Sequence, residues 1–188
     1  MAETVQIALL RGVMPTGRNR VPMAELRVLL SRLGFGDVRT LLATGNAVFR
    51  SHGPVGAKLE ALLERAIADE IGPTLDVVVR DADAFARIVA ANPFPEESAA
   101  MPSRVQATLF KTPPTPEQGR AFEALVRPPE KGKVIGDVVW LVHPDGVSAS
   151  ALRASDWTSA FGKFVGAARN WNTLSKIHAA AQELARAG

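Results

Sequence analysis

The sequence predicts an α+β protein made of two lobes, each with the element order β-α-β-β-α-β, followed by an extra C-terminal helix. Short apolar runs typical of buried strands alternate with longer segments whose apolar residues recur at helical spacing, and turn residues separate them. The length of 188 residues suits one large domain or two small lobes. We expect a first lobe with a connecting helix over residues 1–91, a Pro- and acid-rich linker over 92–103, and a second lobe over 104–188.

The first lobe opens with a short apolar run that is typical of a buried strand, followed by a loop rich in Gly, Pro, Asn and Arg. Pro22 suits the first turn of a helix, and Gly34 suits its end. We expect strands at 4–10, 38–42, 47–50 and 75–79 and helices at 22–33 and 55–71, with a hairpin turn at Thr44-Gly45-Asn46. This order is that of the ferredoxin-like α-β plait.

The same order recurs after residue 104, although no direct sequence repeat is visible. Thr115 begins a capping-box pattern, and Gly136-Asp137 is a good two-residue turn. We expect strands at 105–110, 133–135, 138–142 and 165–168, helices at 115–125 and 156–164, and a last helix at 173–187 capped by Asn172. The prediction is therefore a tandem pair of ferredoxin-like lobes.

Composition excludes several classes of function. The apolar fraction of 47% and the charged fraction of 22% are those of a globular protein. There is no cysteine, which excludes disulfides, thiolate zinc sites and thiol nucleophiles. His52, His143 and His178 have no partner at metal-ligand spacing, so we expect neither a metal nor a cofactor. No signal peptide and no apolar stretch of ~18 residues is present, so we expect a cytoplasmic protein that does not enter membranes.

Charge is distributed unevenly along the chain. The net charge is +3, with basic excess in residues 1–50 and 101–188 and acidic excess in 51–100. This weakly favours an anionic partner and does not by itself indicate nucleic acid.

The topology predicts an anion site in the first lobe. In a split βαβ unit the first two strands are parallel, so their carboxyl ends lie at the same edge of the sheet. The loop after the first strand should therefore lie beside the hairpin turn, together with the partly positive N-terminus of the first helix. Arg20 adds positive charge to the loop. A phosphate or carboxylate group suits such a site, whose candidate residues are Arg11, Gly12, Gly17, Arg18, Asn19, Thr44, Gly45 and Asn46.

Each of these signals also has a purely structural interpretation. Gly45-Asn46 is a good hairpin turn that needs no ligand, and Arg11 can simply pair with a neighbouring acid or carbonyl. A second candidate is Arg169 with Asn170, which beside Trp171 could hold a planar or phosphorylated ligand. Here helix capping and packing account for every residue type, and the structural interpretation is favoured.

Two segments carry a family resemblance: ALLRGVMPTGRNRVPMAELRVLLSRLGFGDVRTLLATGNAVF near the start and ARNWNTLSKIHAAA near the end. They resemble the bacterial domain of unknown function 1697 family over about a third of the chain. The resemblance implies tandem α-β plaits and no known substrate. Compared with the family pattern, the first loop lacks an Asn and a Gly, and Leu41 and Ala167 replace a Tyr and a Thr. If those polar groups contact a ligand, this member binds something different or nothing.

Three function classes stay open. The first is a binding or regulatory module for a small anionic molecule. The second is nucleic-acid binding, against which the chain has no Tyr and only Phe49 among the aromatics of the first four strands, so stacking worth ~1–3 kcal/mol per base is missing. The third is an enzyme acting on a phosphorylated small molecule at the same edge, for which no general base or nucleophile with a partner is visible. The residues do not indicate the oligomeric state.

Overall fold

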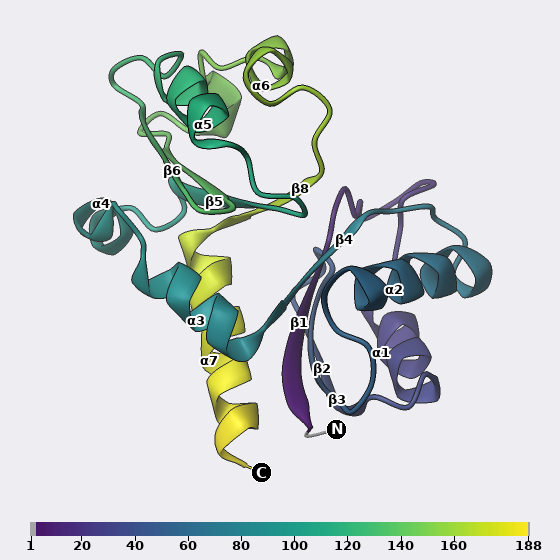
Figure 1. Cartoon of the computed structure of the whole chain (residues 1–188). Helices are drawn as coiled ribbons and strands as arrows, with labels where there is room; N and C mark the ends of the chain where they lie inside the picture. The colour runs from purple at the N-terminus through teal and green to yellow at the C-terminus, as the bar shows by residue number, and fades with distance from the viewer. Residues whose placement is uncertain (1–2, 188) are drawn as a thin grey trace. The chain divides into compact units, whose positions relative to one another are not determined.

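The computed structural model describes residues 3–187. These residues form two four-stranded antiparallel sheets and seven α-helices (Figure 1). The contacts divide the chain into two compact units. The first unit runs to Arg87 and takes up the chain again from Ser175, and the second unit is Ile88–Leu174. No helix among the described residues is long and apolar enough to cross a membrane.

The first unit contains a sheet with the strand order β2-β3-β1-β4. Its elements are β1 Thr4–Leu10, α1 Met23–Arg32, β2 Gly36–Leu41, β3 Asn46–Ser51, α2 Gly56–Glu70 and β4 Val77–Asp81. Both helices pack on one face of the sheet, α1 beside β2 and α2 beside β4 (Figure 1). Their leucines meet the inward side chains of the strands in a core that includes Leu10, Phe49 and Val79. Burial of such side chains is the main source of stability for the unit.

The second unit repeats this element order, as expected. Its sheet has the order β6-β7-β5-β8. Its elements are α4 Pro95–Ala100, β5 Val105–Phe110, α5 Pro116–Glu123, β6 Lys131–Ile135, β7 Val138–Val142, the 3-10 turn η1 Val147–Ala149, α6 Ala154–Phe161 and β8 Gly166–Asn170. Aromatic side chains dominate the core under α5 and α6, where Phe122 packs against Trp157 and Phe161 with ring centroids 4.6 and 4.9 Å apart.

The two units share the pairing register of their central and edge strands, a similarity that was not visible in the sequence. In the first sheet Ile7 lies opposite Arg80, and in the second Ala107 lies opposite Arg169. The central strands then align as Val-Gln-Ile-Ala-Leu-Leu and Val-Gln-Ala-Thr-Leu-Phe, with three of the six residues identical. Both arginines donate from Nη1 to the carbonyl of the preceding residue. The repeated order of elements is therefore accompanied by a repeated register.

Two helices continue across the division between the units: α3 Ala82–Ala90 and α7 Trp171–Arg186. The C-terminal part of α7 groups with the first unit, whereas residues 104–188 were expected to form one lobe. Polar contacts accompany this grouping: Arg39 pairs with Glu183 at 3.0 Å, and Arg50 donates to the carbonyl of Leu184. The expected linker at 92–103 also differs, since it contains helix α4 with Pro95 at its start.

The N-cap of α7 is Asn170 and not Asn172, so that prediction was wrong. The Asn170 side chain accepts a hydrogen bond from the Thr173 amide at 3.0 Å, whereas Asn172 lies exposed in the first turn. The cause is strand pairing: Asn170 is the last paired residue of β8, opposite Gln106, and the helix begins directly after it.

Glutamates from the helices bond to the outer edge of one strand in each sheet. β4 is an edge strand, and its amides at Val77 and Val79 donate to the carboxylates of Glu64 and Glu60 on α2, at 2.7 and 2.9 Å. In the second unit the edge strand β6 donates from Val134 to Glu123 of α5 at 2.8 Å. Backbone donors that no neighbouring strand can satisfy are thereby paired.

Candidate functional site

The end of β1 lies directly beside the turn between β2 and β3, as the strand order requires. The Leu10 amide donates to the Gly45 carbonyl at 2.8 Å. Gly45 has a φ of +76°, and a Cβ built on it would lie 2.7 Å from both the Leu10 Cβ and the Val13 Cγ2. Only glycine fits such a close approach in this conformation. The two segments proposed from topology are therefore neighbours.

The loop between β1 and α1 folds back on itself. The Met14 amide donates to the Asn19 carbonyl at 3.0 Å, and the Arg20 amide donates to the Gly17 carbonyl at 3.2 Å. A Cβ on Gly12 would lie 3.9 Å from the Asn19 Nδ2, so the Asn19 side chain lies over Gly12. These hydrogen bonds within the loop give it a defined shape. The side chain of Asn19, a predicted site residue, is exposed and also lies against the loop.

Arg11 has an acidic partner within the unit. Its guanidinium lies 3.2 Å from the Asp76 carboxylate, and its amide donates to the Asp76 carbonyl at 2.9 Å. Both side chains are nearly half exposed, so the pair is solvent-screened and of low strength. Asp76 precedes β4, which lies next to β1, and its carboxylate offsets the positive charge that the sequence placed on Arg11.

Thr44 and Asn46 take part in closing the turn. Asn46 is fully buried, and its Nδ2 donates to the Leu41 carbonyl at 2.8 Å and to the Thr44 Oγ1 at 3.0 Å. Leu42 in the same turn has a φ of +58°, an uncommon conformation for a side chain of this size. The Asn46 amide therefore holds a strained turn in place, which is a structural role for a residue predicted to bind ligand.

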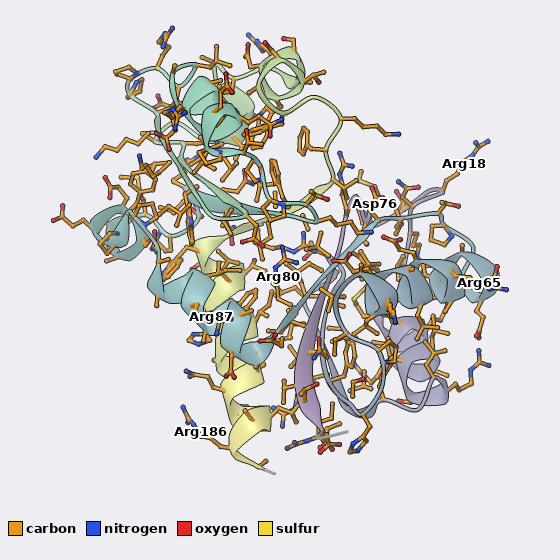
Figure 2. The ribbon with its side chains drawn as sticks, in the orientation of Figure 1. Arg18, Arg65, Asp76, Arg80, Arg87 and Arg186 are labelled. Atoms are coloured by element: carbon orange, nitrogen blue, oxygen red, sulfur yellow. The ribbon has the colours of Figure 1, made fainter. Side chains whose placement is uncertain are left out.

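The remaining positive charge of the loop lies on Arg18 and Arg20, which are both exposed. Figure 2 shows Arg18 extending away from the fold into solvent. No side chain of the described residues caps the N-terminus of α1, where the N-cap is Pro22. First-turn amides and two exposed guanidinium groups are the components that can bind an anion at this edge. Glu25 in the first turn of α1 reduces the positive potential there.

Arg169 and Asn170 belong to the second unit, at the end of β8, whereas the other predicted residues belong to the first. Burial lowers the pKa of Arg169 to about 10. Asn170 caps α7, and Trp171 packs against Trp140 with ring centroids 6.2 Å apart. The structural roles expected of this segment, capping and packing, are thus filled, with Asn170 as the cap.

Sequence reasoning missed a buried polar cluster in the second unit. The Nδ1 of His143 lies 2.5 Å from the Glu130 Oε1, and the Ala151 amide donates to the other carboxylate oxygen at 3.2 Å. Burial alone would raise the pKa of Glu130, but hydrogen bonds from Ser150, His143 and Ala151 lower it below its usual value. The Nε2 of His143 is buried without a partner among residues 3–187. The cluster ties the segment after β7 to the segment before β6.

Residues 3–187 contain no group of three or more His, Asp or Glu side chains arranged to hold a metal ion. The sequence signals for the missed partners were weak. Asp76 is identifiable only from the pairing of Val77 with Leu10, and Glu130 and His143 are 13 residues apart with no motif between them.

The fold and the candidate site define a two-unit α+β protein with polar loops at one sheet edge and no recognisable catalytic group among them. Residues 4–140 match the family described as protein of unknown function, DUF1697, and the chain belongs to that family. No curated protein matches the chain.

Among solved structures, the chain is similar to the conserved bacterial protein SP0830 from Streptococcus pneumoniae. The identity is 22%, the TM-score is 0.67, and the alignment covers 96% of this chain and 99% of the other. At that identity the likeness concerns the fold alone.

Proposed function

We propose that the chain is a small-molecule binding module whose first unit takes a phosphate or carboxylate group at the loop between β1 and α1. The observation that carries the proposal is the close packing of this loop on the β2–β3 turn, through Leu10, Val13 and Gly45. Further support comes from the defined shape of this loop, its two exposed arginines and the start of α1, which has no side-chain cap. The activity of the family is unknown, so the proposal concerns binding and names no reaction.

Each unit is, in this proposal, a ferredoxin-like α-β plait. Support comes from the element order β-α-β-β-α-β in both units and from the antiparallel orders β2-β3-β1-β4 and β6-β7-β5-β8. In such a plait the loops at the carboxyl end of the first strand gather at one edge.

Arg18 and Arg20 are the expected anion contacts, since Arg11 is paired with Asp76. Thermal melting of the full chain should rise with inorganic phosphate or with members of a panel of small carboxylates, because a ligand that binds only the folded state stabilises it. The double substitution Arg18→Ala with Arg20→Ala should remove most of that rise. Arg65→Ala is the matched control, since Arg65 is an exposed arginine on α2 (Figure 2).

The role of Arg11 is tested through its partner. Asp76→Asn removes the competing carboxylate, so phosphate should bind more tightly if the Arg11 guanidinium faces the anion, and Arg11→Ala should weaken binding. Absence of a melting shift with every anion, or a full shift in the Arg18/Arg20 double variant, would refute the anion site.

The nucleic-acid alternative gains no support from Phe49, the aromatic side chain of the first sheet. Phe49 is fully buried and packs against Phe35 with ring centroids 4.6 Å apart, so it offers no surface for stacking a base. The Glu130–His143 pair likewise gives the enzyme alternative little support, because both side chains are buried and hydrogen-bonded to each other.

A further inference from the structure

The second unit contains a pocket whose lining includes none of the candidate binding residues discussed above. It has a volume of about 390 Å³ and lies where β5 ends and β8 begins. Its position in the second unit corresponds to that of the candidate anion site in the first. The Phe110 amide donates to the Asp137 carbonyl at 2.8 Å and the Lys111 amide to the Val165 carbonyl at 2.9 Å, as Leu10 and Arg11 donate to Gly45 and Asp76.

The floor of the pocket is aromatic. The rings of Phe110 and Phe164 are stacked, with centroids 4.9 Å apart and planes at 18°, and Phe161 meets Phe110 edge-on at 5.0 Å. Trp157 is also stacked with Phe164, with centroids 5.6 Å apart and planes at 22°. Phe110 and Phe161 are buried, whereas Phe164 is half-buried and lines the pocket. The cluster therefore gives Phe164 a fixed orientation in the pocket wall, on which a flat apolar group can pack.

The charged side chains of the lining are both basic. Lys111 and Lys163 line the pocket, and no Asp or Glu is among its lining residues. Lys163 is exposed and has no ion pair among the described residues. Gln118 is held in the wall by the capping box with Thr115 and by a bond from its Nε2 to the Phe161 carbonyl. An aromatic floor beside ammonium groups favours a ligand with a flat ring and a negative charge.

We propose that this pocket binds a small molecule that carries an aromatic ring and one anionic group, with the ring packed on Phe164 and the anion beside Lys163. The volume is within the usual range of about 300–1,000 Å³ for small-molecule sites. The proposal does not depend on the anion site of the first unit, because the residues are different and the ring contact has no counterpart there.

Two kinds of ligand share this chemistry: an aromatic carboxylate and a nucleoside phosphate. The probes are 2-naphthoate for the first and adenosine 5′-monophosphate for the second, each titrated into the full chain by calorimetry. The uncharged 2-naphthamide keeps the ring of the first probe and lacks its charge. A probe that binds through both contacts should be weakened separately by loss of the ring contact and by loss of the ammonium group.

Lys163→Ala should weaken binding of 2-naphthoate or of the nucleotide by roughly three- to tenfold, in keeping with a partly exposed charge pair. The same substitution should leave 2-naphthamide binding unchanged. Phe164→Leu keeps an apolar side chain and removes the ring, and it should weaken both naphthyl probes by roughly threefold. Lys58→Ala is the control, since Lys58 is an exposed lysine on α2 of the first unit.

Tighter binding of the nucleotide would assign the site to nucleoside phosphates, and tighter binding of 2-naphthoate to aromatic carboxylates. The proposal is overturned if neither probe binds below about 10 mM, which corresponds to under ~3 kcal/mol of affinity. It is also overturned if Lys163→Ala and Lys58→Ala have the same effect, or if Lys163→Ala weakens the uncharged probe as much as the charged one.

Discussion

Replacing Gly45 by alanine tests the packing on which the candidate anion site depends. Two costs combine at this position. A non-glycine residue at a φ of +76° costs about 1–2 kcal/mol, and forcing a methyl group into a filled space costs about 1–3 kcal/mol. The new Cβ would lie 2.7 Å from both Leu10 and Val13, and neither neighbour offers the far end of a flexible side chain. We therefore expect Gly45→Ala to lower the free energy of unfolding by about 2–5 kcal/mol.

Gly17→Ala is the matched control in the same loop. Its φ of +81° is nearly the same, but nothing lies within 4 Å of the position that a Cβ would take. It should cost only the backbone part, about 1–2 kcal/mol. Thermal melting should fall by roughly 10 °C for Gly45→Ala and roughly 4 °C for Gly17→Ala, from about 2–4 °C per kcal/mol for a chain of this size.

Urea unfolding monitored by circular dichroism gives the free energy of unfolding of each variant, and the two values are then subtracted. A difference of ~1–3 kcal/mol would show that the loop is packed tightly on the turn. Equal effects of the two substitutions would refute the reasoning, because they would mean that space at Gly45 is not limiting and that the loop does not rest on the turn.

Three further substitutions test other contacts. Glu60→Ala leaves the Val79 amide without its buried acceptor and should cost about 1–3 kcal/mol in urea unfolding; no loss would mean that the carboxylate does not stabilise this edge. Glu130 has a lowered pKa, so its contribution is complete above the unfolded-state value near 4.5 and is lost as pH falls through the folded-state value. The stability gap between the native chain and Glu130→Gln should accordingly be full at pH 6 and shrink as the pH falls below about 4.5, and a constant gap would contradict the assignment. Asn170→Ala should lower the melting temperature through loss of about 1 kcal/mol of capping, whereas Asn172→Ala should have little effect; the reverse order would show that Asn172 is the cap.

The order of strands and helices could be predicted from local patterns, because turn residues and apolar spacing mark each element. The capping box at Thr115 was read correctly, since both of its side-chain bonds involve residues three apart. The cap of the last helix was predicted wrongly, because Asn170 and Asn172 are equally suitable by residue type. The choice depends on how far β8 pairs with β5, which is not a local property of the sequence.

The proximity of the two loops was predictable, whereas the ion pairing of their charged residues was not. Strand order alone brings the segment after Leu10 to Gly45, and the hydrogen bond between them follows. The partner of Arg11 required the register of β4 against β1, and Asp76 is 65 residues away. The aromatic pocket was beyond reach for the same reason, since Phe110 and Phe161 meet only after the second sheet has formed.

The glutamates on α2 and α5 have a consequence for encounters between molecules. A strand from another polypeptide that approached β4 would have to displace the carboxylates of Glu60 and Glu64 before it could bond to the backbone. On β6 it would have to displace Glu123, whose second oxygen is held by Lys133. Removing these carboxylates should therefore make the chain more prone to self-association through its sheets, even where the folded monomer survives.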